Sequence, residues 1–355
     1  MAQLKYLYFS TPFLIIAAIL HFHRINSPPL VKNQKKLTSQ VIGKWIVGRH
    51  QQFNDADTLN LQEAIDHALN GDTILLRPGN YEIHQLPQVN LAIRGLSGNP
   101  EEFTIDLKKS IAINNHSLQL ENLFLINSFE AEFGILINDG EINLNNVKVK
   151  FTNTKKDFLI GRNSRFSSQN NHFIGTNKNT SIFLSENAKF SAENNKFIKF
   201  KNAIETQHQT FTGIIELKDI EMSNCLSSAI YLHGGNLIGK NISISKCASG
   251  LIISGESNVT LDQLYVIDNN YYALDVINGG KIKVDLFKFE RNNLAGIRAT
   301  GKSSILQTFN GEISQSQSGL IAEEGASING KNVRLNKNLT SPKLTKEDGE
   351  INIIE

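Results

Sequence analysis

The sequence predicts an all-β protein of the right-handed parallel β-helix class, a solenoid of about 23 residues per coil with a short N-terminal α-helical cap. Three observations favour this fold. Only one amphipathic segment with helical periodicity occurs near the N-terminus, and it stops sharply at Asn70 and Gly71. After it the chain keeps a strand-like pattern to its far end. Short apolar strands then recur at a nearly constant step, the mark of a repeat architecture.

Composition fits a folded body, with 40% hydrophobic and 20% charged residues among 355. The 36 basic and 34 acidic residues nearly balance, which argues against a dedicated nucleic-acid binder. Two cysteines, Cys225 and Cys247, are too few for a disulfide framework. The acids Asp139 and Glu141 lack a diagnostic metal-ligand spacing, so no metal or cofactor is assigned.

Residues 1–24 differ from the rest of the chain. An apolar run from Tyr6 to Leu20 is short for a membrane span but fits the apolar core of a signal sequence. We expect an uncleaved signal anchor; a cleaved signal peptide and a buried apolar arm are the alternatives. Residues 25–40 read as a linker. The chain would then be membrane-anchored or secreted and extracytoplasmic, although more lysine and arginine follows the run than precedes it, against the positive-inside rule.

The predicted cap covers 58–70. Its apolar residues fall on one helical face, and Asp57 or Thr58 would cap its N-terminus. Asn70-Gly71 provides the left-handed stop. A strand, Thr73 to Arg77, and a Pro-Gly-Asn turn follow. The β-helix domain is expected over 41–338, and the polar segment 339–355 is expected to be a tail that leaves the repeat.

The repeat is anchored on a small or polar residue that precedes a short apolar strand. The steps between anchors are 23, 24, 22, 26, 21, 23, 23 and 23 residues. The anchors are Gly134, Asp157, Ser181, Ala203, Ala229, Gly250, Ala273, Gly296 and Gly319. Residues one and three after each anchor should face inward, and residues two and four after it outward. Leucine-rich repeats share the period but need a leucine and asparagine frame that is absent.

A second ladder lies three residues before four of the anchors, at Cys247, Asn270, Asn293 and Ser316, with Cys225 four before its own. Small polar residues at a recurring turn can hydrogen-bond between coils. We interpret the two cysteines as free thiols in this ladder, because stacked coils lie about 4.8 Å apart, which is wide for a disulfide.

The segment QEAIDHALNGDTILLRPGNYE, followed by LAIRGLSGNPEEFTID, resembles the N-terminal cap and first coil of the pectin-lyase-like right-handed parallel β-helix superfamily. The resemblance covers about residues 41 to 338. It implies that the helix closes the open end of the coil. Members are often polysaccharide lyases, hydrolases, esterases or epimerases, so a polysaccharide is the implied partner.

The sequence lacks a complete set of catalytic motifs from any one of these enzyme families. No paired Asp-Asp of the polygalacturonase kind occurs, and the Asp-Pro-His-Asp-like motif of mannuronan epimerases is absent. PGNYE at 78–82 and KDFLIGRN at 156–163 resemble pectinesterase fragments. The glutamine-bearing strands and Arg-Pro-Trp of that family are missing, and the sole tryptophan is Trp45. Asp157 is therefore interpreted as an ordinary residue at the start of a strand.

The outward row carries the candidate site. The resemblance implies that this strand lines a substrate groove. Tyr231 and His233 are candidate acid and base, and Arg298 could hold a uronic carboxylate. Candidate substrate contacts are Glu205, Gln207, Asp275 and Phe183. The hypothesis is binding of an acidic polysaccharide, with lyase or C5-epimerase activity as its enzymatic form.

Two observations oppose catalysis. Tyr231 and Arg298 lie three coils apart, about 14 Å, and Asp275 next to Arg298 would form a cross-strand ion pair. An apolar group, Leu136, Leu159 and Phe183, would form an exposed patch suited to a protein partner or oligomer. A non-catalytic structural or protein-binding β-helix is therefore the alternative.

Overall fold

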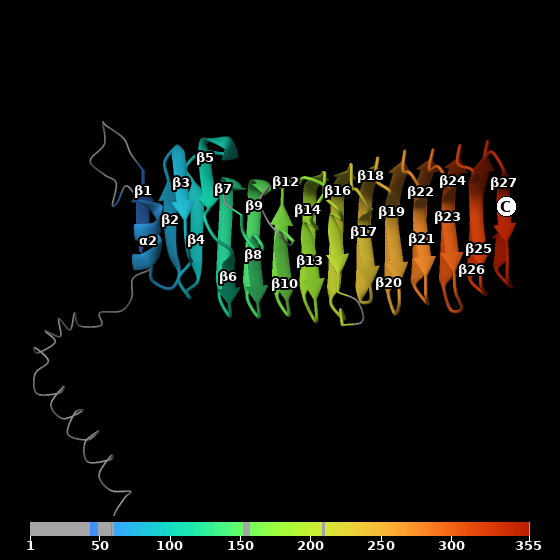
Figure 1. Cartoon of the computed structure of the whole chain (residues 1–355), viewed down its shortest axis with the longest axis horizontal. Coiled ribbons are helices and arrows are strands. Elements are labelled where there is room, and N and C mark those ends of the chain that lie inside the picture. Colours follow the sequence, from blue (N-terminus) through green and yellow to red (C-terminus); the bar gives the residue numbers. More distant parts are fainter. Residues whose placement is uncertain are drawn as a thin grey trace, which may run out of the picture. The chain divides into compact units, whose positions relative to one another are not determined.

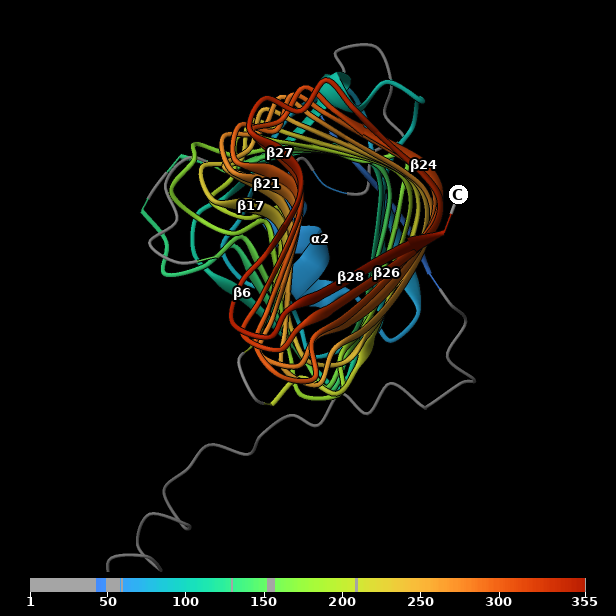
Figure 2. The same ribbon diagram turned by 90° about the vertical axis from the view of Figure 1, so that its right-hand side faces the viewer.

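The computed structural model describes residues 43–48, 58, 60–128, 130–151, 157–207 and 210–354. The predicted signal anchor, the linker and the candidate N-cap Asp57 lie outside these residues. The described chain is a parallel β-helix, in which successive coils stack side by side along one axis (Figure 1). Figure 2 looks down this axis and shows the coils superimposed around a common interior.

Two parallel sheets make up the coil. We call them the long-strand sheet and the short-strand sheet. The long-strand sheet consists of β1 (Lys44–Val47), β2 (Asp72–Leu76), β3 (Gly79–Ile83), β4 (Leu91–Gly95), β5 (Phe103–Leu107), β7 (Ser117–Asn127), β9 (Glu141–Phe151), β11 (Arg165–Gln169), β12 (His172–Ile174), β14 (Lys189–Ile198), β16 (Ile214–Ser223), β18 (Asn236–Ser245), β20 (Asn258–Ile267), β22 (Lys281–Glu290), β24 (Ile305–Ser314), β26 (Ser327–Asn336) and β28 (Glu350–Ile354).

The short-strand sheet consists of β6 (Ile111–Asn114), β8 (Ile135–Asn138), β10 (Leu159–Arg162), β13 (Ile182–Ser185), β15 (Ile204–Thr206), β17 (Ser228–His233), β19 (Ser249–Ser254), β21 (Tyr272–Ile277), β23 (Ala295–Thr300), β25 (Ser318–Glu323) and β27 (Ser341–Thr345). Helix α2 (Leu61–His67) and the 3-10 turn η1 (Pro100–Glu102) complete the described elements.

Each long strand turns a corner at one residue in the left-handed backbone region. Asn146, Asn194 and Asn241 have φ of 52°, 53° and 53° at this corner. Asparagine suits it, because a short polar side chain tolerates this backbone and can bond locally. The amides also bond between coils, as Asn146 Nδ2 donates to Asn122 Oδ1 at 2.8 Å. The corner thus closes the coil and fixes its register.

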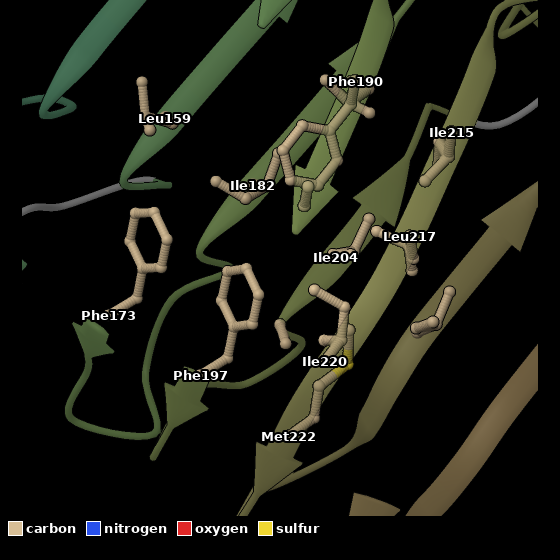
Figure 3. Packing of buried hydrophobic residues seen from close by; sticks show 14 of the residues in the cluster. Leu159, Phe173, Ile182, Phe190, Phe197, Ile204, Ile215, Leu217, Ile220 and Met222 are labelled. Carbon is tan, nitrogen blue, oxygen red and sulfur yellow. The ribbon is translucent and has the colours of Figure 1, made fainter. Parts of the chain in front are cut away.

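The interior is filled by stacked apolar side chains. Phe173 and Phe197, from successive coils, stack with ring centroids 4.7 Å apart (Figure 3). Phe166 and Phe190 repeat this arrangement at 4.7 Å. Burying a phenylalanine side chain stabilises a fold by about 1.5–3 kcal/mol. Phenylalanines at equivalent positions of successive coils therefore stack on one another and help to hold the coils in register.

The small anchors have a packing reason. At Ala229 and Ile230 two consecutive residues are both fully buried. A Cβ on Gly134 would lie 2.3 Å from the Phe151 ring, and one on Gly296 would lie 2.2 Å from Ile313. The anchor therefore faces the interior, and at Gly134 and Gly296 it leaves no room for a side chain. As a result, the residue before the anchor and the residue two after it share the outer face.

The structure corrects one repeat of the predicted register. Ile135 pairs with Leu159, and Leu159 pairs with Ile182, so Phe158 rather than Asp157 takes the anchor position. Leu159 is 1% exposed and belongs to the core. Its predicted place in the outward patch is wrong, and Ile160 fills that place instead.

The predicted helix is shorter than 58–70 and begins at Leu61. Asn60 caps it, because its side chain accepts a hydrogen bond from the backbone N–H of Gln62 at 2.9 Å. Thr58 does not take this role. Thr58 instead lies two residues earlier and binds the Asn60 N–H through its hydroxyl.

The polar segment after residue 338 was expected to leave the repeat, and this is wrong. β27 pairs with β25 and β28 pairs with β26, both parallel and in register. The coil therefore continues to Ile354. A polar composition misled the prediction, because none of the residues in these last two strands is buried.

The predicted turn ladder exists, with a different residue in two coils. Cys247 N–H donates to Asn269 Oδ1 at 2.8 Å, and Asn269 Nδ2 donates to Asn292 Oδ1 at 2.9 Å. Asn269 and Asn292 are buried, whereas the predicted Asn270 and Asn293 are exposed. Both cysteines are free thiols, as expected. In these two coils the ladder residue lies one position earlier than predicted, because that position faces the interior, whereas Cys225, Cys247 and Ser316 are buried at their predicted positions.

Candidate functional site

The outer face of the short-strand sheet brings most of the predicted site residues into one row. In register from coil to coil, the central positions are Leu136, Ile160, Phe183, Glu205, Tyr231, Ile252, Asp275, Arg298 and Ile321. We call this the outer row. Parallel pairing places neighbours in it about 4.8 Å apart.

Asp275 and Arg298 form a bidentate ion pair. Arg298 Nε donates to Asp275 Oδ1 at 2.8 Å, and Nη2 donates to Oδ2 at 2.7 Å. Asp275 is 4% exposed. Burial raises the pKa of its carboxyl, and the Arg298 guanidinium opposes this shift. The guanidinium also lies over the Tyr272 ring, 4.4 Å from its centroid, so three side chains hold one another in a fixed geometry.

Glu205 is fixed by two neutral donors. Its Oε2 accepts from Thr180 Oγ1 and from Asn202 Nδ2, both at 2.7 Å. Asn202 is itself held, because the hydroxyl and the backbone N–H of Ser228 donate to its Oδ1 at 2.9 Å. The carboxylate of Glu205 is thus preorganised without a cationic partner among the described residues.

Asp157 joins this group through Thr180. The Thr180 N–H donates to Asp157 Oδ1 at 3.0 Å, so one threonine contacts both carboxylates. Burial is the main reason why the pKa of the Asp157 carboxyl is raised, and the charge of Glu205 raises it further. Thr180 therefore lies between two carboxyl groups in different environments, and the environment of Asp157 favours the protonated form.

Tyr231 and His233 lie against each other, with ring centroids 3.8 Å apart. His233 Nδ1 lies 2.9 Å from the Ser254 hydroxyl of the next coil. Burial raises the pKa of the Tyr231 phenol, and the charges of Glu205 and Asp275 add to this. Because a raised pKa keeps the phenol protonated, Tyr231 is better suited to donate a hydrogen bond than to act as a base.

The predicted contacts do not all converge. Tyr231 pairs with Glu205 on one side and Ile252 on the other, and Phe183 pairs with Glu205. Gln207 follows the end of β15 and is exposed. Leu136, Ile160 and Phe183 form a half-exposed apolar row at the other end of the face.

Sequence reasoning missed Asp157, Thr180, Asn202 and Tyr272 as members of the face. They occupy the position one before each anchor, which alternation alone would turn inward. The signal that could have found them is the small residue at the anchor. Where two neighbouring residues both pack inward, the residue on each side of the pair faces outward.

Two hollows border or oppose this face. One, of about 750 Å³, lies at the turns after β17 and β19 and includes His233, Ser254, Glu256 and Asn258 in its lining. The other, of about 770 Å³, follows the outer surface of the long-strand sheet across Ser167, Ser191, Lys218 and Lys240. Within the described part of the chain, no group of three or more histidine, cysteine or acidic side chains could hold a metal ion.

Among the described residues, no helix combines the length and apolar character needed to cross a bilayer.

The fold is shared with solved polysaccharide-active proteins. A family GH87 α-1,3-glucanase catalytic domain in complex with nigerose superposes with a TM-score of 0.61 at 13% identity, covering 88% of this chain and 68% of that one. The family 28 exopolygalacturonase of Yersinia enterocolitica gives 0.55 at 11% identity, covering 82% and 74%. The polygalacturonase of Erwinia carotovora ssp. carotovora gives 0.50 at 10%, covering 91% and 100%.

No protein-family profile and no curated protein sequence matches this chain. The structural likeness bears out the fold-level resemblance to pectin-lyase-like β-helices. At these identities it establishes the fold and no particular activity.

Proposed function

We propose that the coil binds a polysaccharide along the outer face of its short-strand sheet. The observation that carries this proposal is a single row that combines aromatic rings with hydrogen-bonded polar side chains. Phe183 and Tyr231 contribute rings on either side of Glu205, and Glu205 and Arg298 offer polar atoms that are held in place. The solved β-helices that carry nigerose or tetrasaccharides add support from the fold.

The physical argument is preorganisation. Ring faces pack against the apolar C–H faces of sugars, and polar groups already held in place lose little entropy on binding hydroxyls. The coils also advance by about 4.8 Å, close to the advance of one sugar along an extended chain. A linear glycan could therefore meet a similar position at each coil.

The test is retention of a protein that includes residues 43–354 on immobilised polysaccharides. Tyr231→Ala should weaken binding about tenfold, the effect of losing roughly 1.4 kcal/mol of contact. Tyr265→Ala is the matched control, because Tyr265 is an exposed tyrosine on the long-strand sheet, 42% exposed. Equal losses in both variants, or none in either, would contradict the proposed face.

The alternative is a structural or protein-binding β-helix. Its motivating feature is the half-exposed apolar row Leu136, Ile160 and Phe183. On this hypothesis, Ile160→Ser would reduce self-association or partner binding while no glycan is retained. Retention of a glycan that is insensitive to Ile160→Ser would favour the first hypothesis.

Hydrolysis is a second candidate function, motivated by Asp157 and Glu205 around Thr180. A carboxyl with a raised pKa suits a general acid, and a second carboxylate suits a base or nucleophile. Lyase or C5-epimerase chemistry has less support, because Tyr231 is disposed to keep its proton and Arg298 already engages Asp275. Release of reducing sugar ends that Asp157→Asn abolishes, with binding retained, would support hydrolysis; unsaturated products would support a lyase instead.

We also propose that residues 1–24 tether the coil to a membrane, with the coil on the extracytoplasmic side, on the strength of the apolar run alone. Added protease should digest the coil on intact cells; protection of the coil would contradict this orientation.

We propose further that α2 closes the open end of the first coil. This proposal rests on Leu61, Ala64 and Ile65, which pack into the apolar core.

A further inference from the structure

The outer row contains one guanidinium, and the charge of that group is already neutralised. Arg298 uses Nε and Nη2 on the two oxygens of Asp275, and its flat face covers Tyr272. The Nη1 edge of the guanidinium keeps N–H donors for another acceptor, but Asp275 already neutralises the charge that would attract a uronic carboxylate. Binding through Nε and Nη2 would require Arg298 to leave a carboxylate that is 4% exposed, and a buried charge left without its partner is strongly destabilising.

The unpaired charge in the outer row itself is negative. Glu205 forms no ion pair within the described residues and is held by Thr180 and Asn202 alone. Asp157 adds less charge, because burial raises the pKa of its carboxyl, and Lys201 acts on it from nearby. The charges of Glu205 and Asp275 both act on Tyr231, which lies between them in the row. Lys346 near this end is engaged with Glu323 at 2.9 Å. An incoming polyanion would therefore meet repulsion at the centre of the face.

We infer that the outer face selects uncharged glycans and excludes polyuronates, with the Asp275–Arg298 pair as the specificity determinant. This inference rests on the proposed function. It replaces the acidic polysaccharide suggested by the sequence, where Arg298 was expected to hold a carboxylate. The carboxylates accept hydrogen bonds from sugar hydroxyls, and a neutral sugar brings those donors without a charge of its own.

One substitution should reverse the preference of the outer face for uncharged glycans. Asp275→Asn keeps the shape of the side chain but removes the charge that neutralises Arg298. The freed guanidinium should then accept a carboxylate, so the variant should gain affinity for polyuronates. Asp275→Asn combined with Arg298→Gln removes both charges and should not gain it.

The experiment measures binding by calorimetry with galacturonate oligomers and with neutral glucan, xylan and mannan oligomers, at low and high salt. The wild type should bind at least one neutral oligomer about tenfold more tightly than the galacturonate oligomer. Asp275→Asn should tighten galacturonate binding about tenfold, and salt should weaken that gain because it screens the new charge pair. Glu205→Gln provides a second route, since it removes an unpaired charge without touching Arg298.

Two outcomes would overturn the inference while leaving glycan binding intact. One is a wild type that prefers the galacturonate oligomer. The other is equal galacturonate affinity in the wild type, Asp275→Asn, Glu205→Gln and the double variant, each shown to be folded by circular dichroism. Failure of every oligomer to bind any of these proteins would instead overturn the proposed function itself.

Discussion

Leu286 occupies the corner position that asparagine, aspartate or glutamine fills in neighbouring coils. Its φ is 51°, in the left-handed region, and its side chain is 46% exposed. The equivalent residues before and after it are Gln263 and Asn310. Asn310 Nδ2 reaches past this position to Asp285 Oδ1 at 2.9 Å. A leucine here gains no burial and bears the full steric cost of the left-handed backbone.

Leu286→Asn should therefore stabilise the coil by about 1 kcal/mol, since asparagine tolerates this backbone far better. The measurement is the midpoint of chemical denaturation at unchanged slope. Leu294→Asn is the matched control, because Leu294 is also exposed, at 37%, and lies outside the positive-φ positions. A shift of the same size in both variants would show that surface polarity, rather than backbone strain, is responsible.

For single residues, the sequence predicts correctly which side chains point inward where inward and outward positions alternate strictly. The prediction fails where two consecutive residues both point inward. Ile230, Leu251 and Leu274 face inward as expected. Leu159 was misplaced because Asp157 resembles an anchor in residue type, whereas the anchor needs a side chain packed against the core. In that repeat the packing places Phe158 there, and no local pattern distinguishes the two choices.

The last strand of the short-strand sheet, β27, carries features that oppose further pairing. Within the described residues it pairs with β25 alone. Lys343 stands opposite Leu320, at an inward position, and Pro342 precedes it without a backbone N–H. Prolines and inward-pointing charges are common ways of keeping an edge strand from joining another chain.

Replacing both residues, as Pro342→Val with Lys343→Ile, should allow end-to-end association. The new strand would offer an additional donor and an apolar inward residue to a second copy. Sedimentation velocity over a range of concentrations should show dimers for the double variant and fewer for the wild type. The control replaces Lys331 and Arg334, which lie on the surface of the preceding coil outside the positive-φ positions, by isoleucine and valine. Association caused equally by the control would indicate nonspecific stickiness.

The same edge explains why the end of the coil was predicted too early. The apolar pattern is interrupted in β27, because Lys343 and Thr345 stand opposite the buried Leu320 and Ala322. It resumes in β28, where Ile351 and Ile353 pack against the core. Hydrogen bonding between coils does not depend on the side chains of β27, so the strand forms although its inward positions are polar.

In the molecule as a whole, regular stacking turns a repeat in the sequence into one continuous face. The period predicted the coil and, except for Ile160, the order of residues along the outer row. It did not predict the Asp157–Thr180–Glu205 connection or the Tyr272–Arg298 contact. Both contacts join the residue before an anchor to a residue two positions after an anchor. These positions lie on the same face only because the anchor and the residue that follows it both pack inward in each coil.

The most direct test of the central claim is a crystal structure of the protein with a bound neutral oligosaccharide. We predict ordered sugar along the outer face of the short-strand sheet between β15 and β23, in contact with Tyr231 and within hydrogen-bond distance of Glu205. Ordered sugar found only over the Ser167 to Lys240 hollow of the long-strand sheet, or only in the turn hollow beside Glu256 without contact to Tyr231, would contradict the account.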